Sequence, residues 1–274
     1  MNCFSFFAIL LSLVSWAAPV AAQYRRFLLN FEGNQFDSGR ITGRIQDPID
    51  DFVLSDFSVI TAQDLPSDKI SITSLKTSLL RPCSPNHYIV RIAPGTQDAT
   101  TDRGSTVGIR SSLDANGNPS FRSFDIDSLC MACVFLPAIT QGQAVGGPIP
   151  TDPLTQVAAP ASCNITLTGQ KYTPPGQIST GPVQFTVPYY ANAPYDVSDP
   201  MSFRVSGMTR YLFGPRWTDL VLLQIKISDA MIPPAVGLPP GLNPVFKLGN
   251  NFASIALDNF NGTKHLGSGS VGVP

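Results

Sequence analysis

Short runs in which apolar and polar residues alternate recur along the chain, and this period of two is typical of β-strands. Asn116-Gly117 is a strong turn signal and predicts a hairpin between two of these runs. No stretch keeps a helical period, so we expect an all-β fold, an antiparallel β-sandwich. Strands are predicted at 27–31, 52–60, 88–92, 106–110, 121–126, 130–136, 163–167, 183–187, 201–205, 220–227 and 252–259.

The first residues form an apolar segment of another kind. Phe4 to Val14 is almost entirely apolar but shorter than the roughly 20 residues that cross a bilayer as a helix. Val20 and Ala22 are small residues at the two positions that signal peptidase reads. We therefore expect residues 1–22 to be a cleaved signal peptide and the protein to be secreted and extracellular, without a membrane span. The alternative is a short membrane anchor, which the lack of a close basic stop-transfer flank disfavours.

After this segment the chain reads as one domain. Two irregular stretches, 141–160 and 231–250, are rich in Gly or Pro, but neither separates two complete sets of strands. We expect a single β-sandwich domain over 23–260. Residues 261–274 are predicted to form a disordered Gly/Ser tail.

Charge is scarce, and this narrows the classes of partner. Charged residues make up 14% of the chain and the formal net charge is −1. Phosphate backbones bind to clustered Lys and Arg, so the composition argues against nucleic-acid binding.

Four cysteines remain after the predicted cleavage: Cys83, Cys130, Cys133 and Cys163. In an oxidising compartment an even count indicates two disulfides, which allows three pairings. Cys130 and Cys133 also have the spacing of a redox or zinc motif. On a strand, however, they face opposite sides, which disfavours bridging them to each other. Each is therefore expected to pair at longer range.

Two sequons predict a glycoprotein. Asn164-Ile165-Thr166 and Asn261-Gly262-Thr263 fit the N-glycosylation acceptor pattern, whereas the proline of Asn118-Pro119-Ser120 excludes that triplet. In a secreted chain, Asn164 and Asn261 become candidate surface glycosylation sites.

Four segments, taken in order, resemble a group of uncharacterised secreted fungal proteins with a jelly-roll, galactose-binding-like domain. They are an opening strand at 27–33, a central strand at 124–133, a Cys-x-Ile-x-Leu-x-Gly strand at 163–169, and a closing trio at 201–205, 217–225 and 255–260. The resemblance implies a jelly roll in which Cys133 pairs with Cys163, leaving Cys83 with Cys130. Two departures are Glu32, where an Asp is usual, and the long Pro-rich segment 231–250.

The same resemblance suggests a structural Ca²⁺ near the first and last strands. Glu32 and Asp258 are the candidate ligands, because Ca²⁺ prefers oxygen donors. The alternative is that Asp258 accepts hydrogen bonds from nearby backbone. We predict no other cofactor.

Catalytic candidates are few. His87 is predicted in a turn and His265 in the tail, and no Gly-x-Ser-x-Gly motif is present. Asp125 and Asp127 share one face of a strand and are the candidates for a carboxylate pair. Glu32 is the only glutamate, which lowers the odds of a glycosidase. The alternative is that Asp125 and Asp127 face solvent on a hairpin.

Aromatic residues suggest a ligand surface. Tyr189, Tyr190 and Tyr195 lie between prolines and are predicted either to stack on a sugar or to pack at an edge, while Trp217 is predicted in the core. We expect a monomeric, non-catalytic binding module for a glycan, a cell wall or a host surface, including a role as a fungal effector. The alternative is a secreted enzyme, either carboxylate-based and glycan-active or a ligand-shaping catalyst of a biosynthetic pathway.

Overall fold

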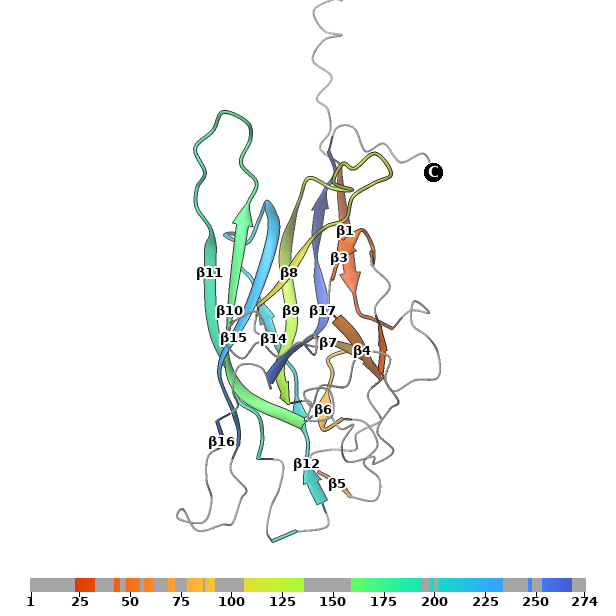
Figure 1. The fold of residues 1–274 in the computed structure, drawn as a ribbon, viewed down its shortest axis with the longest axis vertical. Helices are drawn as coiled ribbons and strands as arrows, with labels where there is room; N and C mark the ends of the chain where they lie inside the picture. Colours follow the sequence, from red (N-terminus) through yellow and green to blue (C-terminus); the bar gives the residue numbers. More distant parts are fainter. Residues whose placement is uncertain are drawn as a thin grey trace, which may run out of the picture.

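Thirteen of the described strands form one large curled sheet, and the other four form two separate two-stranded sheets (Figure 1). The computed structural model describes residues 23–32, 42–44, 48–54, 57–61, 69–71, 78–85, 87–91, 106–135, 159–193, 198–199, 202–233, 246–247 and 253–267. Its strands are β1 (Tyr24–Leu29), β2 (Thr42–Arg44), β3 (Phe52–Val53), β4 (Phe57–Thr61), β5 (Lys69–Ser71), β6 (Leu80–Arg81), β7 (His87–Arg91), β8 (Thr106–Ser111), β9 (Ser123–Phe135), β10 (Ala159–Lys171), β11 (Val183–Tyr189), β12 (Ser202–Arg204), β13 (Ser206–Gly207), β14 (Thr209–Leu212), β15 (Leu220–Ile232), β16 (Phe246–Lys247) and β17 (Ala253–His265).

The sheet has two halves joined at β9 and β10. One half runs β2-β4-β7-β17-β9, with β1 also paired to β17 and β14 to β9. The other runs β10-β15-β8-β3, with β11 on β10 and β16 on β15. The described pairings are antiparallel apart from the short β6–β13 pair. The predicted all-β, antiparallel, sandwich-like fold is therefore confirmed.

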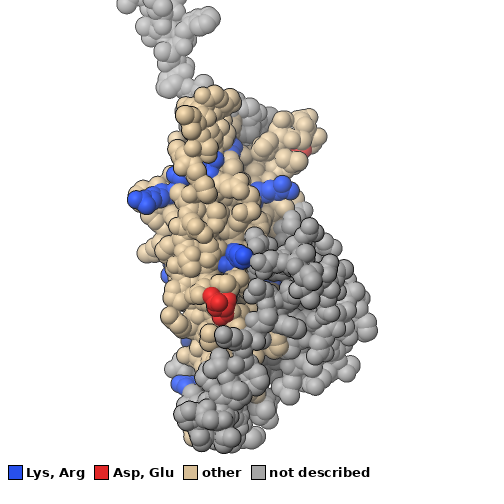
Figure 2. Space-filling model, turned by 60° about the vertical axis from the view of Figure 1, so that its left-hand side comes forward, with Lys and Arg blue, Asp and Glu red and all other residues tan. Residues whose placement is uncertain are grey.

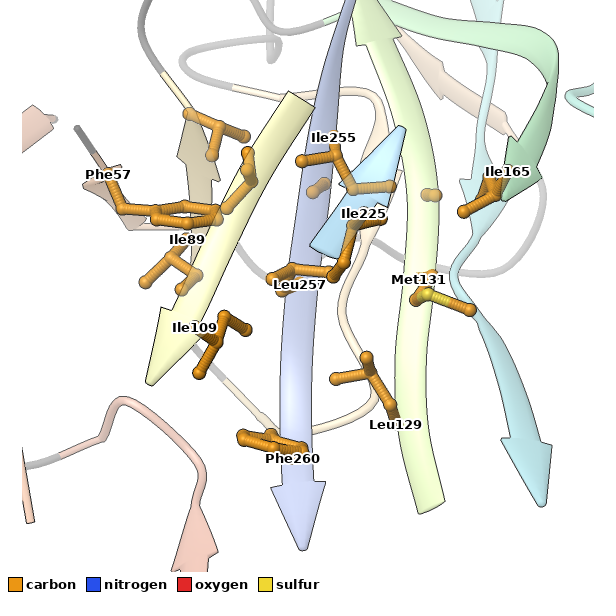
Figure 3. Close-up of a cluster of buried hydrophobic side chains, with 14 of the residues drawn as sticks. Phe57, Ile89, Ile109, Leu129, Met131, Ile165, Ile225, Ile255, Leu257 and Phe260 are labelled. Atoms are coloured by element: carbon orange, nitrogen blue, oxygen red, sulfur yellow. The ribbon is translucent and has the colours of Figure 1, made fainter. Parts of the chain in front are cut away.

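A hydrophobic core lies between the two halves (Figure 3). Ile109 of β8 and Ile225 of β15 are fully buried together with Leu129 and Met131 of β9. At one end, the ring of Phe52 lies 4.8 to 5.6 Å from those of four other phenylalanines, which are Phe27, Phe121, Phe124 and Phe260. Since β3 and β1 belong to different halves, these ring contacts join the halves directly.

The disulfides are those that the family resemblance implies. Cys133 is bonded to Cys163, and Cys83 to Cys130. The first bond lies where β9 pairs with β10 and so fastens the place at which the two halves of the sheet meet. Cys130 and Cys133 do not bridge each other, as the alternation of a strand predicted.

Three strand predictions need correction. The run 52–60 is divided between β3 and β4, while the runs 121–126 and 130–136 are one continuous strand, β9. The turn at Asn116-Gly117 is present, with Asp114 Oδ1 accepting the N–H groups of Asn116 and Asn118. The strands on either side of it do not form a hairpin, however. β8 pairs with β15 and β9 with β17, because the turn carries the chain from one half of the sheet to the other.

The predicted boundary of the tail is also wrong. β17 continues to His265, and both Lys264 and His265 are buried. Residues 261–265 are held because they pair with β1 on one side and β9 on the other. The predicted signal peptide, residues 1–22, lies outside the described residues, as do residues 268–274. Within the described ranges, no helix has the length and apolar character needed to cross a membrane.

Candidate functional site

The outer side of the β11-β10-β15-β8 half carries an array of polar side chains, most of them uncharged. Along β10 every second residue is buried, so the intervening residues face outward. The same alternation on β11 and β15, with the observed register, places their polar residues beside those of β10. We call this surface the polar face. It comprises Asn164, Thr166, Thr168 and Gln170 of β10, Gln184 and Thr186 of β11, Gln224, Lys226 and Ser228 of β15, and Arg110 of β8.

The polar face is built in rows that cross the strands. Thr168 lies opposite Gln184 on one side and Gln224 on the other. In the next row, the hydroxyls of Thr166 and Thr186 are 3.0 Å apart. Figure 2 turns the side that carries β11 and β10 toward the viewer and shows a largely uncharged surface with scattered Lys and Arg. The face therefore offers many neutral hydrogen-bond donors and acceptors on a rigid sheet.

The predicted tyrosine platform is reduced to one described ring. Tyr189 is buried and its hydroxyl donates to the Gly207 carbonyl, so its ring packs in the core and is not offered to a ligand. Burial also raises the pKa of Tyr189 well above its usual range. Tyr190 is 80% exposed and directly follows β11. Tyr195 lies outside the described residues.

Trp217 is buried, as predicted. Its ring lies 5.1 Å from that of Phe213 and 6.5 Å from that of Phe185. It belongs to the packing between the end of β14 and β11 rather than to an exposed surface.

Both sequons fall on strands. Asn164 lies on the polar face, where its side-chain amide donates to Asp229 Oδ2. Asn261 lies in β17 opposite Leu28 of β1. Each side chain is half-buried. A glycan on Asn164 would therefore cover part of the polar face.

The two predicted Ca²⁺ ligands contact neighbouring residues of one segment, Asp258 from β17 and Glu32 from the stretch that follows β1. Asp258 is fully buried in β17, and its carboxylate accepts hydrogen bonds from the Ser84 N–H at 2.6 Å and the Ser84 hydroxyl at 2.8 Å. Glu32 accepts the His87 N–H at 2.9 Å. These contacts match the alternative that Asp258 accepts local hydrogen bonds. A thermal melt in Ca²⁺ and in EGTA tests the predicted ion.

The two candidate catalytic carboxylates belong to different surroundings. Asp127 is exposed and lies 3.4 Å from Arg26. Asp125 instead lies 2.9 Å from His265 Nε2 and accepts the Asp219 N–H at 2.8 Å. The structure therefore brings Asp125 together with His265 and Asp219 rather than with Asp127. Sequence reasoning missed His265 as a site residue because it was predicted to lie in a tail. It missed Asp219 because no nearby motif indicates a site there.

No protein-family model matches the chain, and no curated protein matches it. A solved structure of a family 29 carbohydrate-binding module from Piromyces equi aligns with it at a TM-score of 0.30 and 8% identity, over 89% of this chain and 93% of that one. At this level of similarity, the function must be inferred from the residues of this chain.

Proposed function

We propose that this protein is an extracellular, non-catalytic module that binds a neutral glycan through the polar face. The observation that carries the proposal is the row Gln184–Thr168–Gln224, which sets an amide, a hydroxyl and an amide side by side on three adjacent strands. Amide and hydroxyl groups both donate and accept hydrogen bonds, and so do the hydroxyls of a sugar.

The spacing and surroundings of this row suit a polymer of sugars. Neighbouring strands lie about 4.8 Å apart, so successive side chains of a row are separated by roughly the width of one sugar ring. The residues beneath the row, such as Leu167 and Ile225, are fully buried, and this keeps the strands in place. Tyr190 supplies an exposed aromatic ring near the end of β11, where a sugar ring can pack.

The extracellular address rests on the predicted signal peptide and agrees with two disulfides, which persist in oxidising compartments. Glycans of a fungal cell wall or of a host surface are ligands of this class. An effector role belongs to the second of these settings.

Binding of the purified, enzymatically deglycosylated protein to a glycan array and to insoluble neutral polysaccharides tests the proposal. We expect the double variant Gln184→Ala, Gln224→Ala to bind about tenfold more weakly, because each lost hydrogen bond contributes about 1 kcal/mol or less. The matched control is Gln177→Ala, in the exposed turn between β10 and β11. No binding to any neutral glycan, or equal binding by the double variant, would refute the proposal.

A further inference from the structure

His265 ends β17 between two carboxylates that come from distant parts of the chain. Asp125 Oδ2 lies 2.9 Å from Nε2, and Asp219 Oδ1 lies 2.9 Å from Nδ1. The imidazole side chain is only 8% exposed. Buried polar atoms almost always have a hydrogen-bond partner. Despite the short distance to Asp125, Nε2 has no hydrogen-bond partner among the described residues.

We propose that Asp125 and His265, supported by Asp219, bind a divalent transition-metal ion such as Zn²⁺. The candidate ligand atoms of the three residues all lie within 4.8 Å of one another. Ligand atoms that are each about 2.1 Å from a common ion lie about 3.0 to 3.4 Å apart, depending on the angle between the two bonds. A short N···O contact without hydrogen-bond alignment is the geometry expected of two neighbouring ligands of one ion.

The surroundings of the ring select which nitrogen binds. A neutral imidazole has one N–H and one lone pair, and Nδ1 lies 2.9 Å from Asp219 Oδ1, so an N–H on Nδ1 would have a carboxylate within reach. Nε2 then carries the lone pair on the side of Asp125. Metal-binding histidines commonly donate their other N–H to a carboxylate in this way.

Further contacts hold the carboxylates in place. The Ser123 hydroxyl donates to Asp219 Oδ1 at 3.3 Å, and the Asp219 N–H donates to Asp125 Oδ1 at 2.8 Å. Asp219 adopts a positive φ of 56°, which is uncommon outside glycine. Its side chain is 48% exposed, so the site is open to solvent on that side.

The ligand types favour a particular class of metal. Imidazole nitrogen suits zinc and other first-row transition metals, whereas Ca²⁺ and Mg²⁺ take oxygen ligands. A Zn²⁺ ion at this position would connect β9, β17 and the segment that enters β15. It would also reduce the repulsion between the two carboxylates.

Zinc content and affinity test the proposal. We expect the metal-free protein to take up one equivalent of Zn²⁺ by calorimetry and mass spectrometry, and His265→Gln to bind at least tenfold more weakly. Asp219→Asn should weaken binding by about tenfold or more, as loss of a supporting carboxylate commonly does. His87→Gln is the matched control, because His87 also lies 3.0 Å from a carboxylate, that of Glu32, and it should bind like the wild type.

A measurement on the wild type guards against variants that fail to fold. In ¹⁵N spectra of the imidazoles, Zn²⁺ should shift Nε2 of His265 and leave His87 unchanged. The proposal is overturned if the folded wild type takes up no Zn²⁺, if His265→Gln binds as tightly as the wild type, or if His265 stays doubly protonated in saturating Zn²⁺ and forms an ion pair only.

Discussion

Lys264 and His265 are neighbours in β17, yet their side chains enter two different surroundings. Lys264 is 0% exposed, and its ammonium lies 5.3 Å from the centre of the Phe52 ring. It donates to the Asp50 carbonyl and lies 3.0 Å from the Asp50 carboxylate and 3.1 Å from that of Asp51. The ammonium group of Lys264 is therefore surrounded by three oxygen acceptors, the Asp50 carbonyl and the carboxylates of Asp50 and Asp51.

His265 also lies between two aspartates, but with one ring nitrogen unused. The two residues differ in whether they keep a lone pair that can bind a cation. An ammonium has three donors and no acceptor, so aspartates can only saturate it. An imidazole has a lone pair as well, so two carboxylates around it leave room for a cation. Similar acidic surroundings therefore stabilise the fold at Lys264 and prepare a binding site at His265.

The largest expected effect is that of Lys264→Ala. Removing the buried cation leaves Asp51 without its lysine partner and Asp50 with only the surface residue Arg25, and it opens a cavity beside Phe52. The free energy of unfolding should therefore fall by about 4 kcal/mol. Urea unfolding measures this loss. The control is Arg25→Ala, because Arg25 pairs with the same Asp50 from the surface at 3.4 Å and should contribute less than about 1 kcal/mol. Equal losses would remove the distinction between a buried and an exposed partner.

The next largest effect is that of added Zn²⁺, which should stabilise variants at Lys264 and at His265 to different extents. At a free concentration 100 times the dissociation constant, a bound ligand raises the free energy of unfolding by about 2.7 kcal/mol. We expect this stabilisation in the wild type and in Lys264→Met, and about half of it or less in His265→Gln, whose binding is expected to be at least tenfold weaker. Thermal melts with and without Zn²⁺ measure it, and an equal gain in His265→Gln would contradict the contrast.

Gly262→Ala should disturb both Lys264 and His265, because it changes the packing of β17 against β9 just before these two residues. A Cβ at Gly262 would overlap the Asp125 carbonyl oxygen and lie 3.0 Å from the Phe27 ring. We expect a loss of about 2 kcal/mol and weaker Zn²⁺ binding. Gly207→Ala is the control, because a Cβ there meets no atom within 4 Å. Equal losses of unfolding free energy for Gly262→Ala and Gly207→Ala would show that the close approach of Gly262 to Asp125 is unimportant.

The smallest effect concerns a third charge of β17, Asp258. Burial raises the pKa of Asp258 above its ordinary value of 3.8, and hydrogen bonds from Ser84 and Asn259 oppose this rise. The folded chain then holds this proton more tightly than the unfolded chain. The resulting stabilisation is full below pH 3.8 and is lost as the pH rises through the raised pKa. Urea unfolding from pH 3 upward should show this decline relative to Asp258→Asn, and parallel curves would contradict it.

Much of the fold follows from patterns local to each strand. The alternation in 163–167 and 183–187 predicted β10 and β11, and the same alternation already contained the polar face, since Thr166, Thr168 and Gln184 occupy its outward positions. The family resemblance supplied the disulfide pairing. These features depend on residues close together in sequence or on the order of motifs.

The sites on β17 could not be predicted in this way. Lys264 and His265 are polar residues in a Gly-rich region, and nothing nearby indicates that they are buried. The partners of Lys264 are 213 or more residues away in the sequence. The partners of His265 lie on another strand and in the segment before β15. Tyr189 shows the reverse error, because flanking prolines suggested a loop where the chain forms a strand with its ring in the core.

The position of β17 in the sheet also bears on the order in which the molecule assembles. β17 pairs with β1, β7 and β9, and it follows all other described strands along the chain. Both disulfides, by contrast, join cysteines between positions 83 and 163. During synthesis, oxidation can therefore fasten β9 to β10 while β1 still lacks its partner. Pairings between such distant segments form slowly. We therefore expect the half that contains β1 to close late, around a framework that is already cross-linked.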